Sequence, residues 1–310
     1  MDMKNCRTAY GETLVKLGAE NKNIVVLEAD LGKSTMSILF GNKYPERYFQ
    51  VGIAEQNMAS VAAGLALEGK TAFINSFAVF TPGRAYDQIR SSVCIPNLNV
   101  MICGSSAGLS DYGDGKTHQS VDDIAITRVL PHMTVLSPVD AVETEQMVKA
   151  MCQNKGPCYI RINRNDLPVF TDPKEEYHIG KMSRIRDGKD VVVFATGVMV
   201  SQAVKAAELM DKEGVSVRVV NISTIKPLDI QALKNHCQGM KGVVTAEEHS
   251  IYGGLGSAVC EALSAERLPV RILGIEDSFG RSAENYELLL KRYHLMPEDI
   301  AEKIKLVLND

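Results

Sequence analysis

Three groups of side chains between Gln50 and Gln119 could do chemistry, and the first is a single carboxylate. Glu55 follows a predicted short strand at 48–51 and begins a predicted helix. Ligands of α/β proteins usually bind beyond the carboxyl ends of the strands, and a helix N-terminus stabilises negative charge. A carboxylate held there could bind or move a proton. Taken alone, Glu55 is better explained as an acid that only stabilises the helix dipole.

The second group is aromatic. Phe77 and Phe80 lie in the segment NSFAVFTPGR, just before a helix predicted to begin near Pro82, because proline suits the first position of a helix. Two aromatic rings at such a turn could stack on a flat ligand ring. Without further context, the two rings are better explained as part of the core.

The third group is the loop AGLSDYGDGKTHQS, which holds three glycines, two aspartates and His118 and is too polar for a core. Because histidine changes its charge near neutral pH, the loop could bind a ligand or do acid–base work. A surface loop without function is equally consistent. The segment Gly113-Asp114-Gly115 opens like a metal-binding motif that needs an asparagine roughly 25–30 residues later. The first asparagine downstream is Asn154, so we predict no metal site.

The elements that must position these groups alternate in type along the chain. Short apolar, β-branched runs occur at 24–27, 71–74, 99–103, 134–136, 158–162, 191–194, 215–220, 243–245 and 270–275. Such runs are typical of buried strands in a parallel sheet. Between them, helices are predicted at 54–68, 141–153 and 200–212. This alternation predicts an α/β fold with right-handed crossovers.

A polar stretch divides the chain into two parts. The segment TDPKEEYHIGKMSRIRDGK is charged and rich in turn residues. We therefore predict one domain at 1–170, a linker at 171–188 and a second domain at 189–310. A length of 310 residues is consistent with about two domains.

Composition excludes several classes of protein. With 45% hydrophobic and 23% charged residues, the chain can form a core. A net charge of −4 without a basic cluster argues against binding to nucleic acid. The longest strongly apolar stretch, 191–200, is far shorter than the roughly 20 residues of a membrane span. Seven cysteines without CxxC spacing, and a start without a secretory signal pattern, predict reduced thiols and a cytoplasmic protein.

Taken together and in order, these motifs closely resemble the transketolase family. The matching segments are GIAEQ, the phenylalanine-containing turn, RAYDQ and DGKTHQ, followed by EEHSIYGGLGSA in the second part. The resemblance covers nearly the whole chain. It implies a pyrimidine-binding domain for thiamine diphosphate, followed by an α/β domain of the transketolase C-terminal type.

The resemblance also implies cofactor-binding residues. A glutamate at the position of Glu55 hydrogen-bonds the pyrimidine ring of thiamine diphosphate and is catalytic. Phe80, with Phe77 nearby, matches the aromatic residues that pack on that ring, and Asp30 matches an aspartate of the cofactor pocket.

Substrate residues follow from the same resemblance. Asp114 and His118 match residues that contact the sugar, and His118 is expected to be catalytic. Arg7, Ser34 and Arg164 match the pocket for the terminal phosphate of the substrate. One position departs from the family: many transketolases have a histidine eight residues before the aspartate at Asp114, where this chain has Ser106. This departure puts the usual preference for sugar phosphates in doubt.

The activity that the resemblance implies is transfer of a two-carbon ketol unit from a ketose or its phosphate to an aldose or its phosphate, as in the pentose phosphate reactions. The family's N-terminal half, which binds the diphosphate and Mg²⁺, has no counterpart in these 310 residues. We therefore expect a separate N-terminal partner subunit that holds most of the Mg²⁺ site, and an α2β2 heterotetramer.

Two alternatives remain open. One is a subunit of another thiamine diphosphate enzyme, either similar to deoxyxylulose-phosphate synthase or the β subunit of a 2-oxo acid dehydrogenase. The DGKTHQ loop argues against the dehydrogenase. The other is a non-catalytic homologue, against which the presence of Glu55, Phe80 and His118 together argues.

Overall fold

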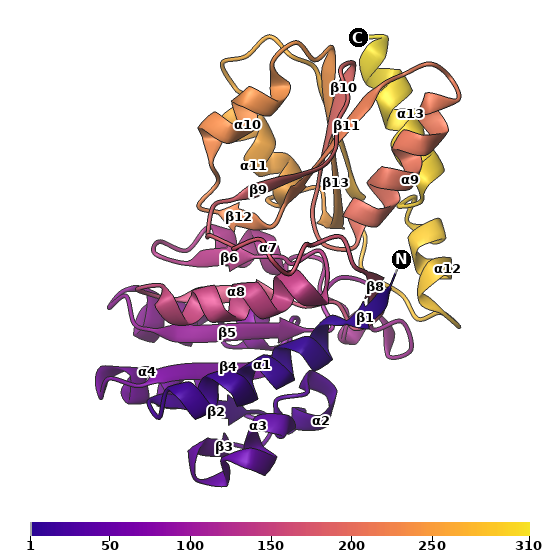
Figure 1. The fold of residues 1–310 in the computed structure, drawn as a ribbon. Helices are drawn as coiled ribbons and strands as arrows, with labels where there is room; N and C mark the ends of the chain where they lie inside the picture. Colours follow the sequence, from indigo (N-terminus) through magenta and orange to yellow (C-terminus); the bar gives the residue numbers. More distant parts are fainter. Residues whose placement is uncertain (1) are drawn as a thin grey trace.

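The computed structural model describes residues 2–310. The first half of the chain folds around a seven-stranded sheet (Figure 1). Its strand order is β12-β6-β7-β5-β4-β2-β3. The strands are β2 (Ile24–Glu28), β3 (Tyr48–Gln50), β4 (Thr71–Phe77), β5 (Val100–Ser105), β6 (Thr134–Leu136), β7 (Cys158–Arg161) and β12 (Thr224–Lys226). All of them run parallel except β12, which pairs antiparallel with β6.

Helices cover both faces of this sheet, because its strands are apolar on both sides. In β2, Ile24 and Val26 enter one hydrophobic cluster, whereas Val25 and Leu27 enter the other. The helical elements here are α1 (Cys6–Glu20), α2 (Gly32–Thr35), α3 (Ile38–Lys43), η1 (Pro45–Arg47), α4 (Glu55–Leu67), α5 (Thr81–Arg84), α6 (Tyr86–Gln88), η2 (Ile89–Cys94), η3 (Gly115–Thr117), α7 (Asp123–Arg128) and α8 (Ala141–Gln153). Helices α1 and α8 pack against each other on the first face, and α4 contributes to the second cluster. A parallel sheet buried on both faces matches the predicted α/β class.

A second sheet organises the rest of the chain, with the order β14-β13-β10-β11-β9 (Figure 1). Its strands are β9 (Met182–Arg186), β10 (Val191–Ala195), β11 (Val217–Ile222), β13 (Gly242–Ser250) and β14 (Val270–Ile275). Its helices are α9 (Met199–Asp211), α10 (Ile230–Cys237), α11 (Leu255–Ala262), α12 (Tyr286–Arg292) and α13 (Pro297–Leu308). Only β9 runs antiparallel to its neighbour.

The predicted elements agree with this architecture. Each of the nine apolar runs overlaps a strand, and the three predicted helices correspond to α4, α8 and α9 within one residue. Sequence patterning missed the antiparallel pair of β1 (Met3–Asn5) and β8 (Asp166–Pro168), as well as β9 and β12. Strand β9 lies inside the stretch predicted as a linker, 171–188.

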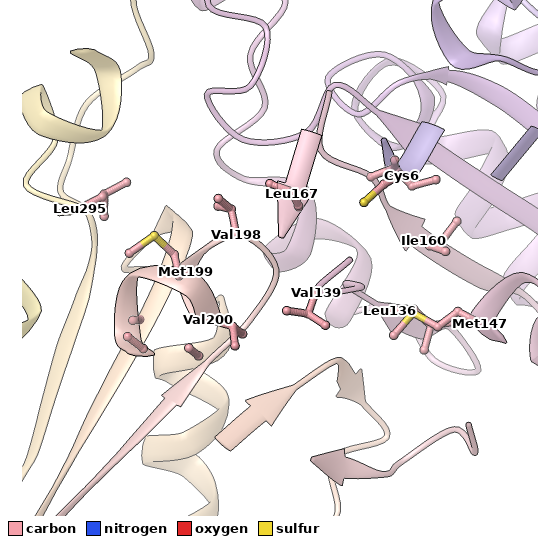
Figure 2. Close-up of a cluster of buried hydrophobic side chains, with 14 of the residues drawn as sticks. Cys6, Leu136, Val139, Met147, Ile160, Leu167, Val198, Met199, Val200 and Leu295 are labelled. Atoms are coloured by element: carbon pink, nitrogen blue, oxygen red, sulfur yellow. The ribbon is translucent and has the colours of Figure 1, made fainter. Parts of the chain in front are cut away.

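Two features join the two halves of the chain. Strand β12 comes from the second half but completes the edge of the first sheet beside β6. A continuous cluster of buried side chains also crosses the junction, from Cys6 and Ile160 to Val198 and Met199 (Figure 2). All seven cysteines are free. No helix in residues 2–310 has the length and apolar character to span a membrane.

Candidate functional site

The predicted site residues follow the carboxyl ends of neighbouring parallel strands. Asp30 follows β2, Glu55 follows β3, Phe77 ends β4, His118 follows β5 and Arg164 follows β7. In the parallel register, Glu28 lies opposite Asn75, and Phe77 lies opposite Ser105. The strand ends therefore meet at one edge of the sheet, where ligands of α/β proteins usually bind.

Glu55 is bound by Arg84, which opens the RAYDQ segment but was given no role in the predicted site. The Glu55 side chain is only 2% exposed and lies at the first position of α4. Arg84 Nη1 donates to both carboxylate oxygens, at 2.9 Å and 3.0 Å. The Arg84 guanidinium also lies over the Phe80 ring, 4.4 Å from its centroid. Glu55 is therefore paired in charge, and Arg84 is half exposed and can be displaced.

The aromatic residues form a small stack beside Glu55. The Phe77 and Phe80 rings are nearly parallel, with centroids 6.1 Å apart. The His118 ring meets Phe80 edge-on at 5.4 Å and Phe77 at 6.2 Å. Phe77 is buried and supports Phe80, which keeps part of its surface exposed. The structure thus brings together Glu55, Phe77, Phe80 and His118 from three strand ends.

Asp30 lies beyond β2 and beside a buried acid, Glu28. Asp30 is exposed and has a left-handed backbone (φ 63°), which aspartate tolerates better than most residues. Glu28 is fully buried; its Oε2 accepts hydrogen bonds from Leu31 N at 2.6 Å and Gln50 Nε2 at 3.3 Å. Its Oε1 has no partner among the described residues. Burial raises the pKa of Glu28 to about 7. The signal for this residue was an acid that ends an otherwise apolar run.

A second polar cluster contains Arg7, Ser34 and Arg164, the three residues predicted to bind the terminal phosphate. Arg7 Nη1 donates to the backbone oxygen of Ser34 at 2.9 Å. Burial, and then the charge of Arg164, lower the pKa of Arg7. Arg164 Nη1 donates to Asp111 Oδ2 at 2.7 Å. Asp111 was not predicted as a site residue, although it is one of the two aspartates of the polar loop.

Asn5 ties this cluster to the start of α1. Strand β1 pairs with β8, so Asn5 lies opposite Asp166. The Asn5 side chain caps α1 by accepting from the backbone N–H groups of Arg7 and Thr8. Its amide also donates to the backbone oxygen of Arg164 at 3.1 Å. One side chain therefore fixes both arginine-bearing segments.

The loop that carries Asp114 and His118 begins with a strained residue. Ser106 is fully buried with φ 53°, and its hydroxyl has no hydrogen-bond partner in residues 2–310. Such backbone strain concentrates at functional sites. Asp114 is exposed and borders a cleft of about 1230 Å³ between the loop and the second domain. Neither Glu55 nor Arg164 lines this cleft.

Polar side chains of the second domain hold this loop in place. Glu248 Oε1 accepts hydrogen bonds from Leu109 N at 2.9 Å and from the Tyr286 hydroxyl at 2.7 Å. Beside it, Arg161 Nε donates to Asp123 Oδ2 at 2.8 Å, and Arg161 Nη2 donates to the backbone oxygen of Glu248 at 2.6 Å. Burial raises the pKa of Glu248 to about 7.

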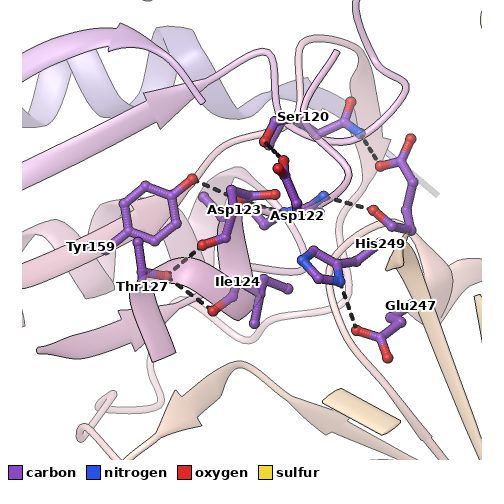
Figure 3. Close-up of polar contacts among 12 residues, drawn as sticks. Ser120, Asp122, Asp123, Ile124, Thr127, Tyr159, Glu247 and His249 are labelled. Carbon is purple, nitrogen blue, oxygen red and sulfur yellow. Dashed lines mark hydrogen bonds and ion pairs between the residues drawn. The ribbon is translucent and has the colours of Figure 1, made fainter. Parts of the chain in front are cut away.

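The neighbouring residues Glu247 and His249 are also structural (Figure 3). The Glu247 carboxylate accepts from Leu255 N and Gly256 N, both at 2.7 Å, and so caps α11. His249 Nε2 accepts from Ala125 N at 3.3 Å, across the junction of the two domains. Within residues 2–310, no group of three or more His, Cys, Asp or Glu side chains is arranged to hold a metal ion.

Family models match both halves of the chain. The transketolase pyrimidine-binding domain matches residues 2–169, and the transketolase C-terminal domain matches residues 180–300. Together they account for most of the sequence.

Relatives named as a transketolase, or as a subunit or section of one, are similar to this chain over most of its length. A protein of Methanocaldococcus jannaschii, which carries the provisional name of a transketolase C-terminal section, is 43% identical over 97% of this chain and 95% of its own. The 6-deoxy-6-sulfo-D-fructose transketolase subunit SqwH of a Clostridium species is 38% identical, over 88% of this chain and 85% of its own. Human transketolase is 36% identical over 96% of this chain, which spans 48% of that protein.

Solved structures agree with the sequence comparisons. A split gene transketolase, described as an inactive β4 tetramer, has a TM-score of 0.89 and 43% identity, with 98% of both chains covered. Transketolase from Campylobacter jejuni matches with a TM-score of 0.82 at 19% identity, over 98% of this chain and 47% of that protein, which supports the fold alone. The chain therefore belongs to the transketolase family, as a C-terminal subunit made of the pyrimidine-binding and C-terminal domains.

Proposed function

We propose that this chain is the C-terminal subunit of a thiamine diphosphate-dependent transketolase that is active only with an N-terminal partner subunit. In this role it transfers a two-carbon ketol unit from a ketose or ketose phosphate to an aldose or aldose phosphate. The observation that carries the proposal is the arrangement of Glu55, Arg84 and Phe80.

This arrangement fits the aminopyrimidine of thiamine diphosphate. Arg84 is flat and cationic; it donates N–H to the Glu55 carboxylate and stacks over Phe80. A protonated aminopyrimidine is also flat and carries N–H groups at its edge, so it can make the same two kinds of contact. We therefore assign Glu55 and Phe80, supported by Phe77 and with Asp30 at the rim, to the pyrimidine of the cofactor.

Each residue then has a physical role. When bound, thiamine diphosphate supplies the electron sink for cleaving and forming the carbon–carbon bond. Glu55 holds a proton at the pyrimidine edge, because a buried carboxylate within hydrogen-bond reach is an effective acid–base group. His118 lies beside the Phe80 ring, where it can orient and protonate the sugar oxygens, and Asp114 contacts the sugar hydroxyls. Arg7, with Ser34, and Arg164 bind the far end of the sugar.

The partner is inferred from the relatives. Chains of similar extent carry the names of subunits or of a C-terminal section, and the split gene transketolase tetramer made of such chains is described as inactive. We assign the diphosphate and most of the Mg²⁺ site to an N-terminal subunit. An α2β2 heterotetramer follows the preference of soluble assemblies for closed two-fold symmetry.

The test is reconstitution. The chain is co-expressed with the reading frame that encodes an N-terminal transketolase section, and ketol transfer is measured with several ketose donors. Calorimetry then compares binding of thiamine diphosphate with Mg²⁺ to the lone chain and to the complex. We expect transfer and tight cofactor binding only in the complex. Tight binding to the lone chain would refute the shared site, and a well-formed complex that transfers nothing with any donor would refute the activity.

A further inference from the structure

We propose that Asp111 sets the preference of this site for the far end of the donor sugar, and that it favours an uncharged end over a phosphate. The inference rests on the proposed function. Asp111 lies beside Arg164, one of the predicted phosphate contacts, and its charge is opposite to that of Arg164.

The charges that face one another here nearly cancel. Arg7 and Arg164 supply two positive charges, and the Asn5 side chain joins the two segments that carry them. Asp111 binds Arg164 directly at 2.7 Å. At the same junction, the Asp166 carboxylate accepts a hydrogen bond from the Asn5 amide at 2.8 Å. A phosphate dianion would therefore meet two acids together with the two arginines.

Of the two acids, Asp111 would repel a bound phosphate more strongly than Asp166, because Asp111 is buried. Its side chain is 4% exposed, whereas Asp166 is exposed to solvent. Charge interactions weaken in water and remain strong in a desolvated position. The Asp111 carboxylate also occupies one edge of the Arg164 guanidinium, which leaves less of its N–H fork for the two-point contact that phosphate prefers.

An uncharged end suits the same atoms better. A terminal hydroxyl can donate to a carboxylate and accept from a guanidinium at the same time. It adds no charge beside Asp111.

The experiment changes only the charge of Asp111 in the reconstituted complex. Asp111→Asn keeps the shape and an oxygen that can accept from Arg164. KM and kcat are measured with D-fructose 6-phosphate and with D-fructose. We expect KM for the phosphorylated donor to fall about three- to tenfold, with kcat nearly unchanged. We expect KM for D-fructose to stay the same or rise.

Asp211→Asn is the matched control, since Asp211 pairs with Arg186 in the second domain; it should change neither KM. Equal KM changes for the two donors, or none, would overturn the inference. If Asp111→Asn does not fold, as judged by thermal melting, Asp111→Gly tests the same preference, because Arg164, whose side chain is 35% exposed, can be solvated when its partner is removed.

A second measurement separates this inference from the proposed function. Calorimetry with inorganic phosphate reports the charge effect without turnover. We expect the Asp111→Asn complex to bind phosphate at least about threefold more tightly than the unaltered complex. Unchanged phosphate affinity would overturn the role of Asp111 even in an active enzyme. Tighter phosphate binding in a complex without any turnover would leave the charge effect standing and refute the activity.

Discussion

Glu55 is almost completely buried, yet a ligand can reach it by replacing its partner, Arg84. Its carboxylate is 2% exposed, yet its partner Arg84 is 46% exposed. Burial of an unpaired carboxylate is costly, so Arg84 stabilises Glu55 until another group with N–H donors replaces it. Because Arg84 reaches out to solvent, that exchange needs no opening of the core.

Glu55→Gln should lower kcat of the reconstituted complex by about 10²- to 10⁴-fold, since the amide cannot take up the proton. The amide still accepts a hydrogen bond from Arg84, so the melting temperature should change little. Steady-state rates and a thermal melt measure the two effects. Glu68→Gln, at the exposed end of the same helix, is the control and should keep full activity. A folded Glu55→Gln complex that turns over at nearly the normal rate would contradict the assignment.

At the scale of elements, the loop between β5 and α7 depends on the second domain. Leu109 donates its backbone N–H to Glu248, Ala283 N donates to the backbone oxygen of Tyr112 at 2.9 Å, and Gln119 Nε2 donates to the backbone oxygen of Arg281 at 3.0 Å. The loop carries Asp111, Asp114 and His118. A function of the second domain is therefore to fix the loop that forms one side of the candidate site.

Glu248→Ala should loosen this loop. It leaves the buried Leu109 N–H without its acceptor, which costs about 1–3 kcal/mol. We expect faster hydrogen exchange at Leu109 and a higher KM for the donor. Glu248→Gln, which retains an accepting oxygen, should stay close to normal in both, and Glu208→Ala on the exposed face of α9 should change nothing. Unchanged exchange at Leu109 in a folded Glu248→Ala variant would argue against the role.

The sequence predicted those parts of the fold and site that depend on the order of strands and helices along the chain. Glu55, Phe80 and His118 come after successive parallel strands, so their meeting follows from the strand pattern and from the resemblance. Arg84 and Asp111 lie in segments that the sequence analysis quoted, but they were given no site role, because that role depends on which distant side chain each one contacts. Strand β12 was missed because Thr224–Lys226 contains a single apolar residue and forms no apolar run, and because its partner β6 lies in the other domain.

At the scale of the whole molecule, buried acids make stability depend on pH. Burial raises the pKa of Glu28, Glu143 and Glu248 to about 7, above their ordinary value of 4.5. The folded state therefore binds more protons than the unfolded state between about pH 4.5 and pH 7. The protons bound by these acids stabilise the folded state. Their contribution is complete below about pH 4.5 and is lost as the pH rises through 7.

Glu143→Gln should reduce this dependence. Glu143 accepts from Val139 N at 2.7 Å and from Asn221 in the second domain at 3.1 Å. Its ionisation opposes folding above about pH 7, by as much as about 3 kcal/mol. The free energy of unfolding, from denaturant titrations at about pH 5 and pH 8, should fall less with pH in the variant than in the unaltered chain. An equal fall in both would show that Glu143 ionises as readily in the folded chain as in the unfolded one.

The contribution of β12 to the first sheet bears on how such proteins can be rearranged in evolution. A gene fusion or recombination event that moved the pyrimidine-binding domain without its neighbour would leave β6 as a bare edge, and an unpaired edge strand invites aggregation. It would also remove Glu248 from Leu109. We therefore expect the two domains to be inherited together as one module.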